Sequence, residues 1–270
     1  MLFTLTAQAQ TKDPWLEYAV NEISAVYGDN VQVYTEIPKS LLKFGRNRAV
    51  GSSGYATLMT LPTGVDNETY VETNLIAYIS SSSASDTEPL SIEGHTCDGS
   101  DKTFVVQAKT LAGQTKTALD TPLCRITRSY ATGNTDLVGT IYFYQDDTVT
   151  AGVPQTDTKV HMMIPAGTNQ TVKASTTISS TQYYLINEVY ADILKKSAAF
   201  SSIVLEIRLP GKVFRQSVEV AANTGSRVEH EFRPYLIVPK NADVRIRAIA
   251  DGASTDVSGG MQGIIVRIKE

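Results

Sequence analysis

The sequence predicts an all-β fold made of two antiparallel β-sandwich or jelly-roll domains, preceded by an N-terminal arm that contains one short helix. A chain of 270 residues is long enough for two small β-domains with buried cores. After Tyr70, short apolar runs recur at roughly even spacing between turn residues, without a convincing helical pattern. In Asp243–Ala250, apolar residues occupy the even positions and charged residues occupy odd ones, as in a strand with one buried and one wet face.

The N-terminal arm, residues 1–54, begins with a segment that has the pattern of an amphipathic helix. Asp13 is suited to cap this helix, Pro14 to take its first position, and Gly28 to follow its end. Its apolar stripe consists of Leu16, Ala19, Val20, Ile23 and Val26. Val31–Tyr55 shows little periodicity and holds basic residues among glycines and serines. We therefore expect an extended arm that lies over a neighbouring subunit and whose removal leaves the sandwiches folded.

We expect the first β-sandwich over residues 55–150 and a C-terminal jelly-roll-like sandwich over residues 151–270. The boundary is placed in Asp146–Thr158, which contains a glycine, a proline and several threonines. The expected strands of the first domain are Val71–Ser80, Leu90–His95, Thr103–Thr110, Thr115–Leu119, Leu123–Tyr130 and Leu137–Gln145. Those of the second are Val160–Ile164, Thr171–Ile178, Gln182–Tyr190, Ser202–Leu209, Val213–Val220, Arg227–Phe232, Val244–Ala250 and Gly263–Lys269.

One further pairing follows from the charged turn at residues 239–243. The continuous apolar run Tyr235–Val238 is typical of a strand covered on both faces, and it ends at Pro239. The alternating strand that starts at Asp243 follows directly. We expect the two strands to form a hairpin at the rim of a sandwich. The segment Tyr190–Phe200 fits either a helical turn or a loop.

Charge and hydropathy argue against two classes of partner. The formal net charge of −4 gives no global attraction to nucleic acid. No apolar run approaches the ~20 residues needed to cross a bilayer. We therefore expect no direct contact with nucleic acid or membrane. Cys97 and Cys124 could pair if their strands are neighbours, but we expect two unpaired, half-buried thiols.

A metal site is not expected. His95, His161 and His230 lie far apart in the sequence. His95 and Cys97 share one side of a strand and Cys124 could join them, but the paired C-x-x-C spacing of zinc sites is missing. We expect no metal and no cofactor.

No arrangement of carboxylates predicts an enzyme. Asp146 and Asp147 follow an aromatic strand and precede a loop, which is typical of a turn. Glu229 and Glu231 share one face of a strand while His230 faces the other, which indicates a charged rim. The sequence also has no G-x-S-x-G, phosphate-binding glycine loop or H-E-x-x-H motif. We expect no catalytic residue.

Aromatic residues on two expected strands raise the alternative of sugar binding. Tyr142, Phe143 and Tyr144 lie on one strand, and Tyr183 and Tyr184 lie on another. Exposed aromatic side chains on a β-face can stack on sugar rings. Tyrosine is also a favourable strand residue with a wettable tip, so both interpretations stay open.

Several short motifs resemble a family of tailed-phage virion proteins. Residues 13–17, DPWLE, resemble the family's D-P-aromatic-L-E segment, and residues 43–47, KFGRN, match its K-F-G-R-N element. Four longer runs match further elements in the same order: ISSSSASDT (79–87), LSIEGHTCDGS (90–100), IPAGTNQT (164–171) and HEFRPYLIVPKNADVRIRA (230–248). The longer start before Asp13 departs from the family pattern.

The resemblance implies a non-enzymatic virion structural protein that binds the capsid shell and stabilises it as a cement or decoration protein. The implied partners are the major capsid protein and sister copies of the chain, as a dimer or trimer. The implied location is the capsid surface, after synthesis in the host bacterial cytoplasm. The partner-binding residues expected in the arm are Trp15, Lys43, Phe44, Arg46 and Arg48, with the aromatic pair as anchors. The alternative is a receptor- or glycan-binding head-fibre or tail module.

Overall fold

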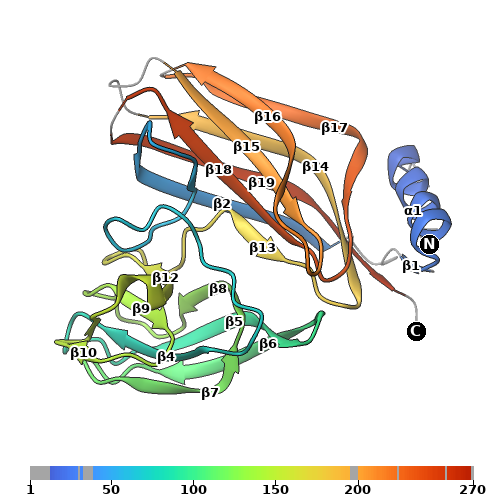
Figure 1. The fold of residues 1–270 in the computed structure, drawn as a ribbon. Coiled ribbons are helices and arrows are strands. Elements are labelled where there is room, and N and C mark those ends of the chain that lie inside the picture. Colours follow the sequence, from blue (N-terminus) through green and yellow to red (C-terminus); the bar gives the residue numbers. More distant parts are fainter. Residues whose placement is uncertain are drawn as a thin grey trace, which may run out of the picture.

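The computed structural model describes residues 13–29, 31–32, 39–194, 200–223, 225–252 and 254–268. These residues form two antiparallel β-sandwiches, one above the other in Figure 1, and a helix near the N-terminus. The all-β sandwich class expected from the sequence is therefore confirmed, and each strand expected after Tyr70 overlaps a strand of the structure. Residues 1–12, 30 and 33–38 of the expected arm lie outside the described residues, as do residues 195–199.

The larger sandwich consists of a helix-covered sheet and an opposite sheet. The helix-covered sheet contains β1 (Val31–Gln32), β2 (Lys39–Val50), β14 (Gln182–Ile193), β17 (Arg227–Val238) and β19 (Thr255–Ile268). The opposite sheet contains β3 (Ala56–Thr57), β13 (Ser175–Thr177), β15 (Phe200–Arg208), β16 (Arg215–Asn223) and β18 (Asp243–Ala250). Apolar side chains of both sheets, including Tyr184, Leu205 and Ile246, form one buried core between them.

The smaller sandwich also has two sheets. One is ordered β12-β9-β4-β7 and the other β6-β5-β8. The strands are β4 (Ile76–Ser81), β5 (Pro89–Asp98), β6 (Asp101–Thr110), β7 (Thr117–Leu123), β8 (Arg125–Ala131), β9 (Ile141–Tyr144) and β12 (Val160–Ile164). A short hairpin of β10 (Val149–Thr150) and β11 (Val153–Pro154) and a 3-10 turn, Asp157–Lys159, precede β12. The core of this sandwich includes Ile79, Leu90 and Phe143.

Helix α1, Pro14–Tyr27, confirms the expected helix and both of its ends. The Asp13 carboxylate accepts a hydrogen bond from the Trp15 amide at 3.0 Å, and Gly28 ends the helix with a φ of 68°. Ala19 and Ile23 are buried against the outer face of the helix-covered sheet. The side chains that they meet are Tyr183, Leu185 and Val266. Val26 is 63% exposed, so this member of the expected apolar stripe does not pack.

The expectation of an extended arm is wrong for residues 39–50. β2 pairs antiparallel with β19 over most of its length and forms an edge of the helix-covered sheet. Gly45 shows how closely this strand is packed, since a Cβ there would lie 1.8 Å from the Leu58 carbonyl oxygen. The periodicity is weak because inward positions hold Lys43 and Gly45 in place of large apolar residues. Removing residues 1–54 would therefore delete an integral strand and uncover the core around Val50, which is fully buried here.

The strand pairing also places the domain boundaries elsewhere than expected. β12 pairs with β9, so a division at residue 150 would cut through the smaller sandwich. β2 and β3 pair with β19 and β18, so they belong to the larger sandwich. The smaller sandwich is thus inserted in the chain between β3 and β13 of the larger one. The loop-rich segment Asp146–Thr158 forms the β10–β11 hairpin inside the insertion.

The expected hairpin around Pro239 is wrong. β17 ends at Val238 in the helix-covered sheet, and β18 begins at Asp243 in the opposite sheet, so the intervening residues cross from one sheet to the other. The apolar run is nevertheless covered on both faces, as its composition indicates. Val238 and Leu236 face the core, whereas Tyr235 and Ile237 pack with α1.

Cys97 and Cys124 form a disulfide bond, so the expectation of unpaired thiols is wrong. Cys97 lies on β5 and Cys124 immediately precedes β8, the neighbour of β5. This adjacency brings the two Cα atoms to 5.8 Å, within the range that a disulfide spans. The pairing depends on a contact between strands that are not consecutive in the chain, which spacing alone does not reveal.

Replacing both cysteines with alanine is expected to lower the free energy of unfolding by about 3 to 4 kcal/mol. The bridge spans 27 residues, and its loss restores conformational freedom to the unfolded chain. Urea denaturation of the wild type and of C97A/C124A measures the difference, and wild type treated with a thiol reductant serves as the comparison. An unchanged denaturation midpoint in both would show that the bridge does not stabilise the fold.

Candidate functional site

The junction between the two sandwiches is built around one buried carboxylate, that of Asp243 at the start of β18. From the smaller sandwich, Arg125 Nε donates to Oδ1 at 3.0 Å and Lys102 Nζ donates to Oδ2 at 3.0 Å. From the larger sandwich, Arg208 Nε donates to Oδ2 at 3.0 Å and the Thr177 hydroxyl donates to Oδ1 at 2.7 Å. Donors from both domains therefore converge on a single side chain.

A second buried carboxylate, Glu68, ties the segment before β4 to the junction. It accepts hydrogen bonds from the Lys173 ammonium, from the Ser175 hydroxyl at 2.7 Å and from the Tyr70 hydroxyl at 2.9 Å. Lys173 also donates to the Ile126 carbonyl on β8 at 2.7 Å. Because Ser175 lies on β13 and Ile126 on β8, this cluster also spans both sandwiches.

The charged positions of β18 do not face water, contrary to the expectation for Asp243–Ala250. Glu206 on β15 accepts from Arg245 Nε and from Arg247 Nε, each at 2.8 Å. The Arg245 guanidinium lies 3.8 Å from the Phe214 ring centre, and Tyr70 meets the Phe214 ring edge-on. The face that alternation predicts to be wet is thus a layer of paired charges and aromatic rings.

The cations of the junction keep these carboxylates ionised. Burial opposes ionisation of Asp243, but Arg125 and Lys102 outweigh it and hold the pKa of this carboxyl well below its ordinary value. Burial likewise opposes ionisation of Glu68, and Lys173 outweighs it and lowers the pKa of the glutamate. Both carboxylates therefore remain charged at neutral pH and retain their partners.

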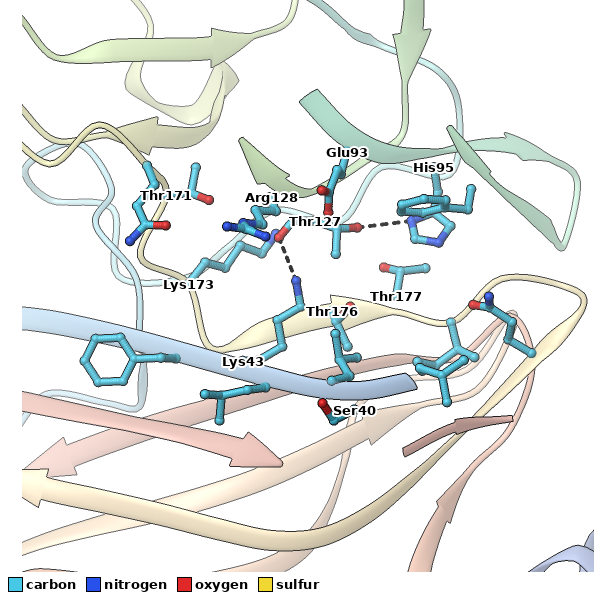
Figure 2. A pocket seen from close by; sticks show the side chains of 18 of the residues that line it. Ser40, Lys43, Glu93, His95, Thr127, Arg128, Thr171, Lys173, Thr176 and Thr177 are labelled. Carbon is cyan, nitrogen blue, oxygen red and sulfur yellow. Dashed lines mark hydrogen bonds between the residues drawn. The ribbon is translucent and has the colours of Figure 1, made fainter. Parts of the chain in front are cut away.

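A cleft of about 550 Å³ opens between the sandwiches beside this network. Figure 2 shows its two walls, with β5 and β8 of the smaller sandwich on one side and β2 and β13 of the larger one on the other. The charged and imidazole side chains that line it include Lys43, Glu93, His95, Arg128 and Lys173. Hydroxyl groups are frequent in the lining and come from Ser40, Thr127, Thr171, Thr176 and Thr177. The cleft is therefore suited to a polar ligand.

Lys43, His95 and Lys173 are buried titratable groups of the cleft, and Lys173 is already paired with Glu68. The Lys43 ammonium donates to the Thr127 carbonyl at 3.1 Å, and His95 Nδ1 lies 3.2 Å from the Thr127 hydroxyl. Burial, reinforced by the nearby charge of Lys173, lowers the pKa of Lys43 to about 7. Burial lowers the pKa of His95 to about 3, so this imidazole is neutral under physiological conditions.

The partner-binding residues expected on β2 do not act as one exposed cluster. Lys43 lies in the cleft, and Phe44 points to the opposite side of the strand with 43% of its surface exposed. Arg46 donates to both carboxylate oxygens of Asp256, at 2.8 and 2.5 Å, so its charge is already paired within the chain. Arg48 is exposed. Because successive side chains of a strand point to opposite faces, β2 places these residues on different sides. The arm expected from the sequence was not a strand, so this separation was not foreseen.

Most of the aromatic residues considered for sugar binding are not exposed. Phe143, Tyr144, Tyr183 and Tyr184 are fully buried, because their strands are covered by a core or by α1. Trp15, the remaining residue of the expected partner-binding set, lies on α1 and is 44% exposed.

The structure also locates the other candidate residues. Within the described ranges, no group of three or more histidine, cysteine or acidic side chains is placed to hold a metal ion. The sulfur atoms of Cys97 and Cys124 are bonded to each other and are not available beside His95. Asp147 accepts the Thr156 amide at 2.7 Å, as expected of a turn residue. No helix in this part of the chain is long and apolar enough to cross a membrane.

Sequence reasoning missed the residues that form the junction. Asp243, Arg245 and Arg247 share one face of β18 and carry both signs of charge, which is the one local signal of internal pairing. Glu68 and Lys102 carry no such signal, because their partners lie more than a hundred residues away in the chain.

No protein-family model matches this chain, and no curated protein sequence does. Among solved structures, the chain is similar to the infectious bursal disease virus Gx strain, with 7% identity, coverage of 89% of this chain and 74% of that chain, and a TM-score of 0.22. It is similar to the CBM22-1–CBM22-2 tandem domain of Paenibacillus barcinonensis Xyn10C, with 10% identity, coverage of 87% and 100%, and a TM-score of 0.22. Likenesses at this level carry no argument about function.

Replacing Asp243 with asparagine is expected to lower the free energy of unfolding by about 3 to 5 kcal/mol, because Lys102 then stays buried without a counter-charge and Arg125 keeps only the exposed carboxylate of Glu72. Asp120 is the matched control, since its side chain is 65% exposed in a pair with Lys109 and D120N should cost less than about 1 kcal/mol. Urea denaturation at pH 7 measures both variants. Equal, small losses would show that the Asp243 cluster does not hold the junction.

The same variants give a pH test of the cluster. The folded pKa of Asp243 is lowered, so its contribution is complete above the ordinary aspartate value of about 4 and is lost as the pH falls towards the folded value. Between pH 5 and pH 3 the wild type should lose more stability than D243N.

Replacing Lys43 with methionine is expected to raise the free energy of unfolding at pH 6.5 by roughly 2 to 4 kcal/mol. The folded pKa of Lys43, about 7, lies below that of an unfolded lysine, so the unfolded state binds more protons and wild-type stability rises with pH above about 7. The gain from K43M should therefore shrink by pH 9.5. Denaturation at both pH values measures it, and a gain that is independent of pH would contradict the assignment to this ammonium.

Proposed function

We propose that this chain is a non-enzymatic structural protein of a virion that binds the capsid shell and stabilises it as a cement or decoration protein. The observation that supports this proposal best is the junction, where Asp243 binds cations from both sandwiches. Paired domains that share buried charges move as one stiff unit, whereas a flexible linker would absorb strain between bridged subunits. The motif resemblance to tailed-phage virion proteins supports the same role.

A non-enzymatic role agrees with the state of the buried carboxylates. Asp243, Glu68 and Glu206 are each saturated by cations or hydroxyl groups. A general acid or base must exchange a proton near neutral pH, and a carboxyl that is held ionised by ion pairs does not do so. These side chains therefore serve cohesion in our proposal.

The surface that we assign to the capsid is the β2 strip, formed by Leu42, Phe44 and Tyr190 on the outer face of the helix-covered sheet. Leu42 is 59% exposed and Phe44 is 43% exposed. Phe44 lies opposite Gly260 in the register of β2 and β19, and Leu42 lies opposite Gln262. A Cβ on Gly260 would lie 2.6 Å from the Tyr190 hydroxyl, so the tyrosine lies over this glycine and the strip is flat.

Further exposed groups extend the β2 strip. Helix α1 packs on the same face of the sheet, over Val266, and presents Trp15 there, 44% exposed. Arg48, exposed near the end of β2, supplies a cation. Aromatic side chains and arginine are enriched in protein–protein interfaces, so this surface is suited to a protein partner. In our proposal this partner is the major capsid protein. Sister copies, as a dimer or trimer, are the second proposed partner, and the capsid surface is the proposed location.

The proposal is tested by co-sedimentation of the purified chain with empty shells of the major capsid protein. Changing Leu42 and Phe44 to serine is expected to weaken binding by about 10- to 100-fold, because both apolar anchors are lost from an otherwise intact strand. The matched control is V106S, since Val106 is 58% exposed on β6 of the smaller sandwich.

Two outcomes would overturn parts of this proposal. Undiminished binding of L42S/F44S moves the interface away from the β2 strip. Failure of the wild type to sediment with shells at low and at high salt excludes the cement role itself. A truncation of residues 1–54 would not test this interface, because it would delete β2 and disturb the fold.

A further inference from the structure

Among the residues that the structure describes, every buried lysine and arginine is matched to a carboxylate except one. The matched sets are Lys102 and Arg125 with Asp243, Lys173 with Glu68, and Arg245 with Glu206. Lys43 is also buried, at 7% exposure, yet no carboxylate of the described residues lies within ion-pair distance of its ammonium. Burying a charge without a partner is costly, and the same chain satisfies this requirement everywhere else in its junction.

The position of Lys43 directs its charge into the cleft. Figure 2 shows the side chain extending from β2 towards Thr127 on the facing wall. An ammonium has three donors, and the described residues offer this one a single acceptor, the Thr127 carbonyl at 3.1 Å. Hydroxyl groups on both walls, those of Ser40, Thr127 and Thr176, surround the same space, whereas the Thr177 hydroxyl already donates to Asp243.

Among the charged groups that line the cleft, Lys43 is the cation whose charge is not neutralised by a neighbouring carboxylate of the described residues. Glu93 on β5 and Arg128 on β8 lie opposite each other in register and contribute opposite charges. Lys173 is paired with Glu68, and His95 is neutral because burial lowers its pKa to about 3. Arg267, which also lines the cleft, has a partner of its own. A ligand with one negative charge therefore balances Lys43.

We propose that the cleft binds one carboxylate group of a ligand, with the Lys43 ammonium as its ion-pair partner and the cleft hydroxyls as hydrogen-bond donors. The cleft of about 550 Å³ has room for a monosaccharide or a short peptide segment. An acidic sugar and an acidic peptide side chain present the same carboxylate. The proposed capsid contact uses Leu42 and Phe44, which alternate with Lys43 along β2 and also border the cleft.

Binding at this site is coupled to protonation of Lys43. Its pKa is held near 7 by burial and by Lys173, and a bound carboxylate favours the charged ammonium. Ligand binding should therefore raise the pKa of Lys43 and take up protons near pH 7. Affinity should fall as the pH rises from 6.5 to 9.

The experiment is an NMR titration of the full chain labelled with 13C-lysine, in which the Cε resonance of Lys43 reports both binding and pKa. The probes are glucuronate and the acetylated, amidated peptide Gly-Glu-Gly. Glucose and the matching Gly-Gln-Gly peptide are the neutral controls. We expect a saturable shift of the Lys43 resonance with at least one acidic probe, a higher Lys43 pKa in the complex and at least tenfold weaker effects of the neutral probes.

Variants assign the effect to Lys43. K43M should weaken binding of the acidic probe at least tenfold in calorimetric titrations, K43R should retain it within tenfold, and K212M, which removes an exposed lysine outside the cleft, should leave it unchanged. Circular dichroism checks that each variant is folded. Binding by one acidic probe alone identifies the ligand source and supports the proposal. Equal binding of neutral probes, equal binding by K43M, or no binding at pH 6.5 overturns it, whatever the outcome of shell sedimentation.

Discussion

The structure depends on the ion pairs that Asp243 makes across the junction of the two sandwiches. The smaller sandwich is inserted between β3 and β13, so two chain crossings join it to the larger one. Without a strong interface such an insertion would move on its connections. Asp243 receives Arg125 and Lys102 from the insertion and Arg208 from its own domain, and Arg125 and Lys102 would lose this buried carboxylate if the domains separated.

The Asp243 and Glu68 clusters make this interface between the domains polar. Ion pairs and hydrogen bonds have fixed geometry, so the Asp243 and Glu68 clusters specify one relative orientation of the domains, whereas apolar faces can slide. Glu68 adds a second point of attachment, through Lys173 and the Ile126 carbonyl. For a protein proposed to bridge subunits of a shell, a defined orientation is as useful as stability.

The same junction contains a group that works against stability. Lys43 is buried beside Lys173 with one carbonyl acceptor, and burial disfavours its charge. Its backbone belongs to β2, whose opposite side presents Leu42 and Phe44. One edge strand therefore contributes to two surfaces, which meet where Leu42 and Phe44 border the cleft. A substitution that shifts the register of β2 would exchange the two sets and disturb both.

The sequence by itself determined helix α1 and the strands after Tyr70, but not strand β2. Period-two alternation indicated the strands, and Asp13, Pro14 and Gly28 marked helix α1, because capping and alternation depend on residues that are near neighbours in the chain. The pairing of β2 with β19, the disulfide between Cys97 and Cys124 and the place of β18 opposite β17 could not be inferred, since each depends on which strands become neighbours in space. The candidate site follows the same division. Lys43 and Phe44 were recognisable as candidates, but only the tertiary structure decided that one is buried and the other exposed, because partners for a buried charge come from distant parts of the chain.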